Sequence, residues 1–315
     1  MSYVILSGGV GGAKLVQGFA NLLPNDQVAV IANTGDDFVH LGLPVSPDLD
    51  TLMYTLAGIA NPATGWGLAN ETYRFMESLK ALGGEDWFTL GDGDIATHIR
   101  RKQLLDDGAD LYEATTVLRE QLNVAVDLIP MSNDSVATLV HSDEGVLGFQ
   151  DYFVRRQAGP KVEKLVYSGS DSANATPAAL QALQQDSLEA VVITPSNPYL
   201  SIDPILSLRD IRAALEDTNT PVIAVSPVVG GKALKGPTAK IMAELGIDCS
   251  VLSIAEHYRG LIDGLIIDEA DAGYRDQLEA TGIAIEVAPT VMTSLAVKTQ
   301  LAKTVAEFAA RLTET

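Results

Sequence analysis

Short apolar runs alternate with segments of helical periodicity along most of the chain. The runs are almost continuously apolar, which is typical of strands in a parallel sheet covered on both faces. They are residues 3–6, 28–32, 191–194, 222–225 and 265–267. Helical patterns cover residues 15–22, 205–215, 238–245 and 294–312. The alternation predicts an α/β fold with right-handed crossovers, in which helices cover a doubly wound, mostly parallel, Rossmann-like sheet.

The alternation is interrupted in the first half of the chain. Helical patterns there cover residues 51–56, 71–82, 95–105 and 113–122. We interpret residues 50–122 as a mostly helical insertion over one end of the sheet. Strand-like pieces follow at residues 137–140 and 164–167. Because the chain has no internal repeat and no proline-rich linker, we interpret residues 1–315 as a single domain that contains this insertion.

The composition is that of a well-folded protein with a strongly acidic charge. Of the 315 residues, 47% are hydrophobic, and the formal net charge is −20. This charge argues against a general nucleic-acid surface, which needs a basic face. It still allows a nucleotide to bind through backbone N–H groups, a few lysines and a metal ion. Since no apolar run approaches the ~20 residues that span a bilayer and no basic leader is present, we expect a cytoplasmic protein with no membrane contact.

A glycine-rich segment joins the first predicted strand to the first predicted helix. Residues 7–14 read Ser-Gly-Gly-Val-Gly-Gly-Ala-Lys. Such a turn presents backbone N–H groups to a phosphate and lets a bulky anion approach closely. Gly9, Gly11, Gly12 and Lys14 are therefore predicted to bind a nucleotide phosphate. Lys14 replaces the third glycine of the dinucleotide pattern, and the Walker A pattern is absent. A tight turn that needs glycine for geometry alone is the alternative.

Two acidic segments follow the second predicted strand. Residues 33–37 read Asn-Thr-Gly-Asp-Asp, and residues 46–51 read Ser-Pro-Asp-Leu-Asp-Thr. Loops at the carboxyl ends of parallel strands lie together, so Asp36, Asp37 and Asp48 are predicted to form a Mg²⁺ site opposite the glycine loop. The alternatives are an Asx-turn with exposed acids, and a helix N-cap in the case of Asp50.

Polar loops also precede or follow other predicted elements. Residues 90–98 contain Asp94, which is a candidate helix cap, and His98 in the first helical turn. A histidine in this position has either a catalytic or a purely structural role. Residues 194–198 read Thr-Pro-Ser-Asn-Pro, so Ser196 and Asn197 offer hydrogen bonds to a base or phosphate.

A second candidate anion loop covers residues 226–237. Gly230, Gly231 and Lys232 are its predicted ligand-binding residues, and a solvated lysine loop is the alternative. Cys249 is the sole cysteine, so no internal disulfide forms. It lies in an apolar stretch that we expect to be a strand entering the core.

Taken together and in this order, these pieces resemble the 2-phospho-L-lactate transferase family of deazaflavin coenzyme F-420 biosynthesis. The matching segments are residues 7–14, 33–37, 46–51, 90–98, 130–132, 148–151, 195–198, 226–237 and 290–293. The resemblance implies transfer of a phosphorylated three-carbon acid from a guanylyl diphosphate donor to the terminal hydroxyl of the deazaflavin Fo, with release of GMP. It also implies a requirement for Mg²⁺ and a homodimer.

The resemblance assigns expected roles to particular residues. Asp50, in the family's Pro-Asp-Leu-Asp-Thr motif, would contact Fo or its hydroxyl, and Asp36 is the second catalytic candidate. Asp94 and His98 would lie near Fo. The donor would be held by Gly9, Gly11, Gly12, Lys14, Ser196, Asn197, Gly230, Gly231 and Lys232.

One position departs from the family pattern. The family usually reads Leu-Gly-Asp-Arg-Asp where residues 90–94 read Leu-Gly-Asp-Gly-Asp. Gly93 lacks the guanidinium that contacts the substrate, so either Arg100 or Arg101 compensates or the donor acid differs. We expect phosphoenolpyruvate or 3-phosphoglycerate in place of 2-phospholactate.

Two other functions compete with this interpretation. A non-catalytic sugar-nucleotide-binding regulator of the same superfamily would share the opening glycine loop, although residues 47–51 and 96–98 favour the transferase. A nicotinamide oxidoreductase is suggested by the fold alone, and Lys14 in the glycine loop argues against it.

Overall fold

The computed structural model of the chain describes residues 2–233 and 236–314. Leu234 and Lys235, which belong to the second candidate anion loop, lie outside the described residues. Within the described ranges, no helix combines the length and the apolar character needed to cross a bilayer.

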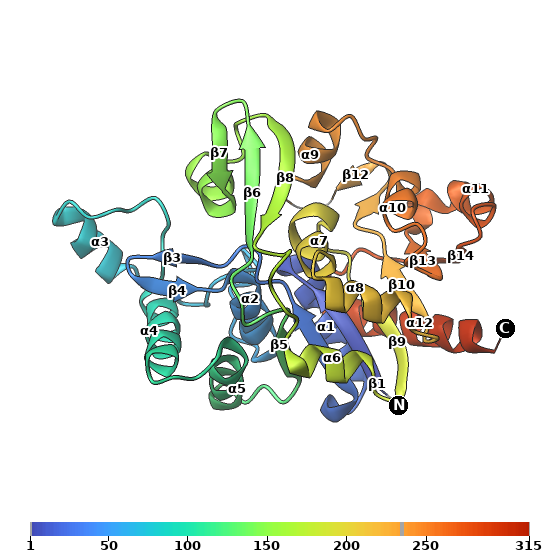
Figure 1. Ribbon diagram of the computed structural model, residues 1–315, viewed down its shortest axis with the longest axis horizontal. Coiled ribbons are helices and arrows are strands. Elements are labelled where there is room, and N and C mark those ends of the chain that lie inside the picture. The colour runs from blue at the N-terminus through green and yellow to red at the C-terminus, as the bar shows by residue number, and fades with distance from the viewer. Residues whose placement is uncertain (1, 234–235, 315) are drawn as a thin grey trace.

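A parallel sheet forms the centre of the molecule (Figure 1). In the described residues it has seven strands, all parallel, in the order β14-β13-β10-β9-β1-β2-β5. The strands are β1 (Ser2–Ser7), β2 (Val28–Ala32), β5 (Asp127–Pro130), β9 (Leu188–Ile193), β10 (Val222–Val225), β13 (Gly264–Ile267) and β14 (Ala284–Val287). The doubly wound α/β prediction is confirmed. The sequence does not predict β5 and β14, because each is short and carries an acidic residue.

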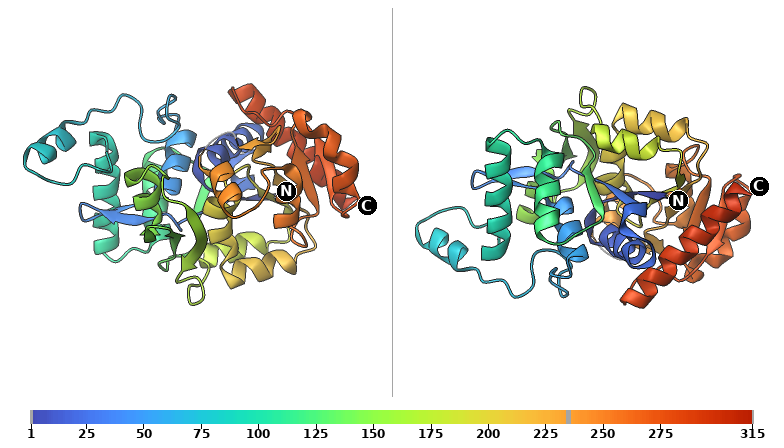
Figure 2. Two further views of the ribbon diagram at one scale, coloured as in Figure 1. Left: turned by 90° about the horizontal axis from the view of Figure 1, so that it is seen from above. Right: turned by 90° about the horizontal axis from the view of Figure 1, so that it is seen from below.

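Helices cover both faces of this sheet, as the continuous apolar strands require. On one face, Phe19 and Phe308 pack in the same core cluster, and Figure 2 shows their helices α1 and α12 side by side. Ile211 and Ile254 pack in the core of the other face. The first face has α1 (Gly9–Leu22), α2 (Pro47–Leu56) and α12 (Leu295–Thr313). The second has α6 (Pro177–Leu183), α8 (Arg209–Glu216), α10 (Val251–His257) and α11 (Arg275–Glu279).

Two additions lie outside the central sheet in Figure 1. Between β2 and β5 the chain forms a small hairpin and helices that project to one side. These elements are β3 (Phe38–His40), β4 (Leu43–Val45), α3 (Arg74–Ala81), α4 (Asp92–Asp106) and α5 (Leu111–Gln121). An antiparallel sheet of order β7-β6-β8 rises beside them. Its elements are β6 (Ala137–Ser142), β7 (Gly145–Gly148), η2 (Asp151–Arg155) and β8 (Val162–Ser168).

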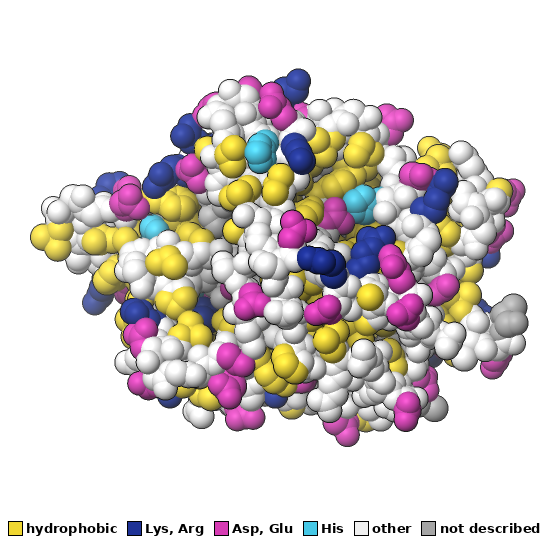
Figure 3. Space-filling view, viewed as in Figure 1, with side chains coloured by type: hydrophobic (Ala, Val, Ile, Leu, Met, Phe, Trp, Pro, Cys, Tyr) yellow, Lys and Arg dark blue, Asp and Glu magenta, His cyan; other side chains and the backbone are white. Residues whose placement is uncertain are grey.

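The remaining elements are short connections. They are η1 (Asn25–Gln27), η3 (Pro198–Ile202), α7 (Asp203–Leu206), β11 (Val228–Val229), β12 (Lys232–Ala233), α9 (Thr238–Glu244) and η4 (Glu269–Tyr274). Acidic and basic side chains are interspersed over the face shown in Figure 3, so the negative charge forms no single acidic patch on that face.

Two local predictions are wrong. The helix expected over residues 205–215 is divided into α7 and α8, because Leu208 between them has an extended backbone, with a ψ of 118°. The strand expected around Cys249 is absent from the described residues. Cys249 lies half-buried in the loop before α10, where Ser250 is the helix N-cap.

Close packing of α1 against α12 requires a glycine at position 18. A Cβ atom at Gly18 would lie 2.3 Å from Lys298 O. We therefore expect Gly18→Ala to lower the free energy of unfolding by about 1–3 kcal/mol, although alanine is the better helix former. Urea unfolding measures this change. Gly273→Ala is the control, since its Cβ would meet no atom within 4 Å. Equal stability of the two variants would contradict the packing argument.

Candidate active site

The loops after β1, β2 and β9 are joined to one another where the strand order reverses. Asn33 N donates to Ser7 O at 3.0 Å, and the Ser196 hydroxyl donates to Gly8 O. The strands on the two sides of this point lead to helices on opposite faces, which leaves a crevice at the carboxyl edge of the sheet. The structure therefore brings together the glycine loop, the first acidic segment and the loop at residues 194–198.

The glycines of the first loop allow close packing within the protein. A Cβ atom at Gly8, Gly11 or Gly12 would lie 2.4, 2.7 or 2.3 Å, respectively, from the nearest protein atom. Gly9 has a φ of +65°, which is the left-handed region that glycine adopts without strain. Packing and turn geometry thus account for the four glycines, and phosphate binding by this loop stays a prediction.

Asp48, in the first turn of α2, connects the glycine loop to the first acidic segment. Its Oδ1 accepts a hydrogen bond from Gly9 N at 2.6 Å, and its Oδ2 accepts from Asn33 Nδ2 at 2.9 Å. The same Asn33 nitrogen lies 3.4 Å from Asp36 Oδ1. One buried amide group therefore holds the carboxylates of Asp36 and Asp48 close together.

Burial and mutual repulsion make these carboxylates difficult to ionise. Burial raises the pKa of Asp36 well above its ordinary value, and the charges of Asp48 and Asp37 raise it further. Burial likewise raises the pKa of Asp37. The pKa of Asp48 is raised by burial to about 6, against the opposing effect of hydrogen bonds from Asn33 and Gly9. A cation among these groups would relieve the repulsion.

Unpaired polar atoms gather at the same edge. Five buried side-chain atoms here have no hydrogen-bond partner among the residues that the structure describes. They are Ser7 Oγ, Thr34 Oγ1, Asp37 Oδ1, Thr138 Oγ1 and Asn197 Nδ2. Because buried polar groups in proteins are almost always hydrogen-bonded, this edge is suited to a polar ligand.

The three predicted metal ligands have the right chemistry but are not arranged as a cage. Carboxylate oxygens are the donors that Mg²⁺ prefers. In the described part of the chain, however, no group of three or more His, Cys, Asp or Glu side chains is placed to hold a metal ion. Both oxygens of Asp48 face protein donors. The residues fit Mg²⁺ by type, and Asp48 would have to turn toward it.

A second buried cluster joins α2 to α4 and contains the predicted acceptor-site residues. Arg101 donates to both carboxylate oxygens of Asp50, with Nη1 3.2 Å from Oδ2. His98 Nδ1 lies 3.2 Å from Arg101 Nη1 and 3.6 Å from Asp50 Oδ2. Its Nε2 lies 3.6 Å from Asp94 Oδ1, which accepts a hydrogen bond from the Tyr54 hydroxyl at 2.7 Å. Asp50, Asp94 and His98 are thus neighbours.

Burial limits what these residues contact. His98 is 1% exposed, Arg101 is 0% exposed and Asp50 is 5% exposed. His98 is enclosed by protein groups, which favours the structural interpretation of this histidine over direct catalysis. A buried carboxylate paired with a guanidinium is held in one orientation, because the two parallel hydrogen bonds fix its plane.

The structure shows what surrounds Gly93. Its N–H donates to Glu71 Oε2 at 2.9 Å, and the next N–H, of Asp94, donates to Glu71 Oε1 at 2.7 Å. Arg101 is paired with Asp50, and the exposed Arg100 donates to Gln103 Oε1 at 3.3 Å. Neither arginine is placed to substitute for the missing side chain, so the structure gives no support to compensation.

The other predicted residues near the first glycine loop contact protein atoms. Lys14 Nζ donates to Met292 O at 3.3 Å. Asn197 Oδ1 caps η3 by accepting from Tyr199 N at 3.0 Å and Leu200 N at 3.1 Å, which leaves its Nδ2 as the unpaired atom. Ser196 is buried against Gly8. Asn197 Nδ2 is therefore the polar atom of this loop that is available to a ligand.

The second candidate anion loop follows β10. Gly230 and Gly231 have φ values of 56° and 73°, so both need glycine. Gly230 N donates to the buried Asp271 Oδ2 at 2.8 Å, and Lys232 is exposed. A carboxylate thus covers an N–H group in each of the two glycine loops.

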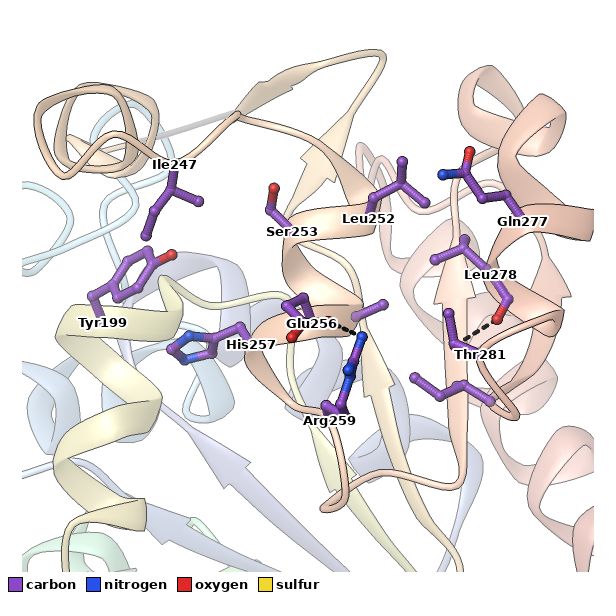
Figure 4. Close-up of a pocket in the computed structure, with 12 residues that line it drawn as sticks. Tyr199, Ile247, Leu252, Ser253, Glu256, His257, Arg259, Gln277, Leu278 and Thr281 are labelled. Carbon is purple, nitrogen blue, oxygen red and sulfur yellow. Dashed lines mark hydrogen bonds and ion pairs between the residues drawn. The ribbon is translucent and has the colours of Figure 1, made fainter.

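A surface pocket of about 530 Å³ lies away from this edge (Figure 4). It surrounds the outer side of α10, with Tyr199 and His257 on one side and Gln277, Leu278 and Thr281 on the other. None of the predicted site residues lines it. The chemistry of the crevice therefore depends on packed polar side chains rather than on a large preformed cavity.

Sequence reasoning did not single out Tyr54 or Asn33 as site residues, and it named Arg101 only as a substitute for the side chain missing at Gly93. Asp94, His98 and Arg101 are spaced by four and three residues, which places them on one face of a helix. This spacing indicates from the sequence alone that Arg101 lies on the same helix face as Asp94 and His98. The partner of Arg101 on α2 depends on tertiary packing, which the local pattern does not contain.

Comparisons with known proteins were made over the whole chain. The family model described as 2-phospho-L-lactate transferase CofD matches residues 3–305. The chain is 39% identical over 309 residues to a phosphoenolpyruvate transferase of Streptomyces coelicolor, with 96% of each chain covered. It is 36% identical over 304 residues to a 2-phospho-L-lactate transferase of Methanosarcina mazei, with 96% of this chain and 99% of the relative covered.

A solved structure shares the fold. The crystal structure of a member of the UPF0052 family from Bacillus halodurans superposes with a TM-score of 0.64. The alignment covers 98% of each chain at 16% sequence identity. This likeness supports the architecture alone.

The ion pair between Arg101 and Asp50 gives a prediction on stability. Arg101→Met should lower the free energy of unfolding by about 3–5 kcal/mol, because it leaves a buried carboxylate without its counter-charge. The double variant Arg101→Met/Asp50→Leu should recover most of this loss. Urea unfolding of both variants measures it. Lys102→Ala, which breaks the neighbouring exposed pair with Asp106 at 2.9 Å, should cost less than about 1 kcal/mol. A similar cost for both single variants would contradict the buried pairing.

Proposed function

The chain belongs to the 2-phospho-L-lactate transferase CofD family, and on this premise we propose that it is a transferase of coenzyme F-420 biosynthesis. It transfers a phosphorylated three-carbon acid from a guanylyl diphosphate donor to the terminal hydroxyl of the deazaflavin Fo, with release of GMP. The observation that carries this proposal is the position of Asp36 and Asp48 beside the glycine loop. Asp48 contacts Gly9 N directly, so carboxylates lie next to the predicted diphosphate position.

The proposed reaction is a displacement at phosphorus. The hydroxyl oxygen of Fo attacks the phosphorus that bears the acid, the bond from that phosphorus to the oxygen of GMP breaks, and GMP leaves with the electron pair. The hydroxyl proton passes to a carboxylate. Asp36 is the proposed proton acceptor, because its carboxylate lies beside Asp48 and the glycine loop, whereas Asp50 is fixed by Arg101 and orients the hydroxyl. Such transfer depends mostly on positioning and charge neutralisation.

Mg²⁺ is the proposed cofactor, and Asp36, Asp37 and Asp48 are the residues that would hold it. When bound, it supplies positive charge to the diphosphate and to the leaving phosphate of GMP. Ser7, Thr34 and Asn197 contribute the unpaired polar atoms that would bind the donor or water nearby. The chain's own glycine-loop N–H groups hold the phosphates.

We infer that the acid is phosphoenolpyruvate. Position 93 has glycine where the 2-phospholactate pattern has arginine, and its N–H is already bound by Glu71. Relatives named phosphoenolpyruvate transferases, from Streptomyces and Thermobifida fusca, are 39–40% identical to this chain. Relatives named 2-phospho-L-lactate transferases are 35–37% identical.

A donor panel tests the function and the choice of acid. The protein is mixed with Fo, Mg²⁺ and the guanylyl donor of phosphoenolpyruvate, 2-phospholactate or 3-phosphoglycerate in separate reactions, and the products are identified by mass spectrometry. We expect transfer with GMP release from every active donor, the highest rate with phosphoenolpyruvate, and none in excess EDTA. Faster transfer from 2-phospholactate would overturn the donor assignment. Nucleotide binding without transfer would support a regulator instead.

A homodimer is the proposed assembly. Exposed large hydrophobic side chains of the described chain concentrate in residues 39–82. They are Val39, Ile59, Trp66, Tyr73, Phe75 and Leu82. Exposed apolar area of this kind marks protein interfaces. Light scattering should give twice the chain mass of 33.3 kDa, and the double variant Trp66→Glu/Leu82→Glu should reduce it to one chain. A monomeric wild-type protein would refute this assembly.

A further inference from the structure

Asp48 occupies the position on the glycine loop where a phosphate oxygen would bind. Its Oδ1 accepts the hydrogen bond of Gly9 N at 2.6 Å, at the start of the 14-residue helix α1. The loop is shaped around this carboxylate, because a Cβ atom at Gly8 would lie 2.4 Å from Asp48 Oδ2. A negative group at a helix N-terminus is favourable. The Asp48 carboxylate therefore already binds the N–H group that an incoming phosphate would need.

A separate observation indicates that an external ligand binds here. Ser7 Oγ is fully buried and has no hydrogen-bond partner among the described residues. It lies against the first turn of α1, since a Cβ atom at Gly12 would be 2.3 Å from it. A buried hydroxyl without a partner costs free energy. The end of β1, next to the first turn of α1, therefore carries a polar group without a partner among the described residues.

We propose that Asp48 is a positioning residue that couples binding of the donor diphosphate to binding of the divalent cation. This inference rests on the proposed function, because it takes the donor to be a guanylyl diphosphate. Without a cation, the diphosphate competes with the Asp48 carboxylate for Gly9 N–H and is repelled by its charge. With a cation, Asp48 turns from Gly9 to the metal, and the N–H group becomes free for the diphosphate.

The surroundings of Asp48 make this turn feasible. Asn33 Nδ2 holds Asp48 Oδ2 at 2.9 Å and lies 3.4 Å from Asp36 Oδ1, so one oxygen of Asp48 already faces the acidic cluster. Movement of the other oxygen away from Gly9 brings the carboxylate toward Asp36. A cation there lowers the repulsion among the acids. Binding of the metal therefore strengthens binding of the diphosphate, and binding of the diphosphate strengthens binding of the metal. Such coupling is reciprocal and typically amounts to about 5–150-fold in affinity.

The second glycine loop provides a contrast. Gly230 N donates to Asp271 Oδ2 at 2.8 Å, in the same way as Gly9 N donates to Asp48. Asp48 shares the amide nitrogen of Asn33 with Asp36, whereas Asp271 lies in η4, after β13. Asp271 therefore covers a glycine N–H outside the acidic cluster, and it should not respond to a cation bound there.

Calorimetric titration of GDP, with 5 mM Mg²⁺ or with EDTA, tests the proposal on the wild-type protein and on Asp48→Asn. We expect Mg²⁺ to tighten GDP binding to the wild type by about tenfold or more. Asp48→Asn should bind GDP in EDTA about tenfold more tightly than the wild type, and Mg²⁺ should change its affinity by less than about twofold. Asp48→Ala should behave in the same way. Circular dichroism establishes that each variant is folded.

Two matched variants serve as controls. Asp36→Asn makes the same change in charge within the cluster but leaves Asp48 on Gly9 N. Its gain in GDP affinity in EDTA should be at least about fivefold smaller than that of Asp48→Asn. Asp271→Asn should leave the ratio of affinities with and without Mg²⁺ as in the wild type.

The outcomes separate this inference from the function on which it rests. If GDP binds to the wild type but Asp48→Asn keeps the wild-type response to Mg²⁺, the coupling role of Asp48 is wrong and the transferase proposal stands. If Asp36→Asn gains as much affinity as Asp48→Asn, net charge rather than the contact with Gly9 is responsible, and the role is again wrong. If GDP binds under neither condition, the guanylyl donor is wrong and the inference fails with it.

Discussion

The crowding of buried carboxylates at the carboxyl edge of the sheet is the constraint on which the rest of the site depends. An ionised carboxylate in the interior is costly unless it is paired or hydrogen-bonded. The protein stabilises each buried carboxylate differently. Arg101 forms an ion pair with Asp50, whereas Asn33 Nδ2 and Gly9 N donate hydrogen bonds to Asp48. Asp36 and Asp37 receive fewer hydrogen bonds: Asn33 Nδ2 lies 3.4 Å from Asp36 Oδ1, and Asp37 accepts from the Ser46 hydroxyl at 2.6 Å while its Oδ1 has no partner among the described residues. This unbalanced charge accounts for the expected affinity for a divalent cation.

The scaffold around these acids is rigid because glycines allow backbones to approach closely. Gly12 packs against Ser7 and the loop after β9, and Gly18 packs against Lys298 of α12. Helix α1 is thereby fixed at both of these points, and its N-terminus cannot shift relative to α2 without disturbing the core. Adjustment on ligand binding is left to side chains such as Asp48, whose hydrogen bonds can be exchanged for those of a metal or a phosphate.

The fold was largely predictable from the sequence, whereas the side-chain pairing at the carboxyl edge of the sheet was not. Apolar runs such as residues 28–32 and 222–225 identify buried parallel strands, and the loops at the carboxyl ends of such strands are expected to meet at one edge. The partner of Asp50 and the contact of Asp48 with Gly9 depend on how α2 and α4 dock, which no local pattern records. The division of residues 205–215 is likewise absent from the local pattern, because Leu208 takes an extended backbone inside an apolar stretch of helical periodicity.

The architecture alone does not separate catalysis from binding, because one fold supports many functions. The buried acids make that distinction. A protein that only binds a nucleotide gains from backbone N–H groups and lysines, and carboxylates beside the phosphates weaken its affinity through repulsion. Retaining Asp36 and Asp48 next to Gly9 therefore opposes simple binding. The same carboxylates are useful when a cation must be held against a diphosphate and a hydroxyl must lose its proton, so their position favours transfer over binding alone.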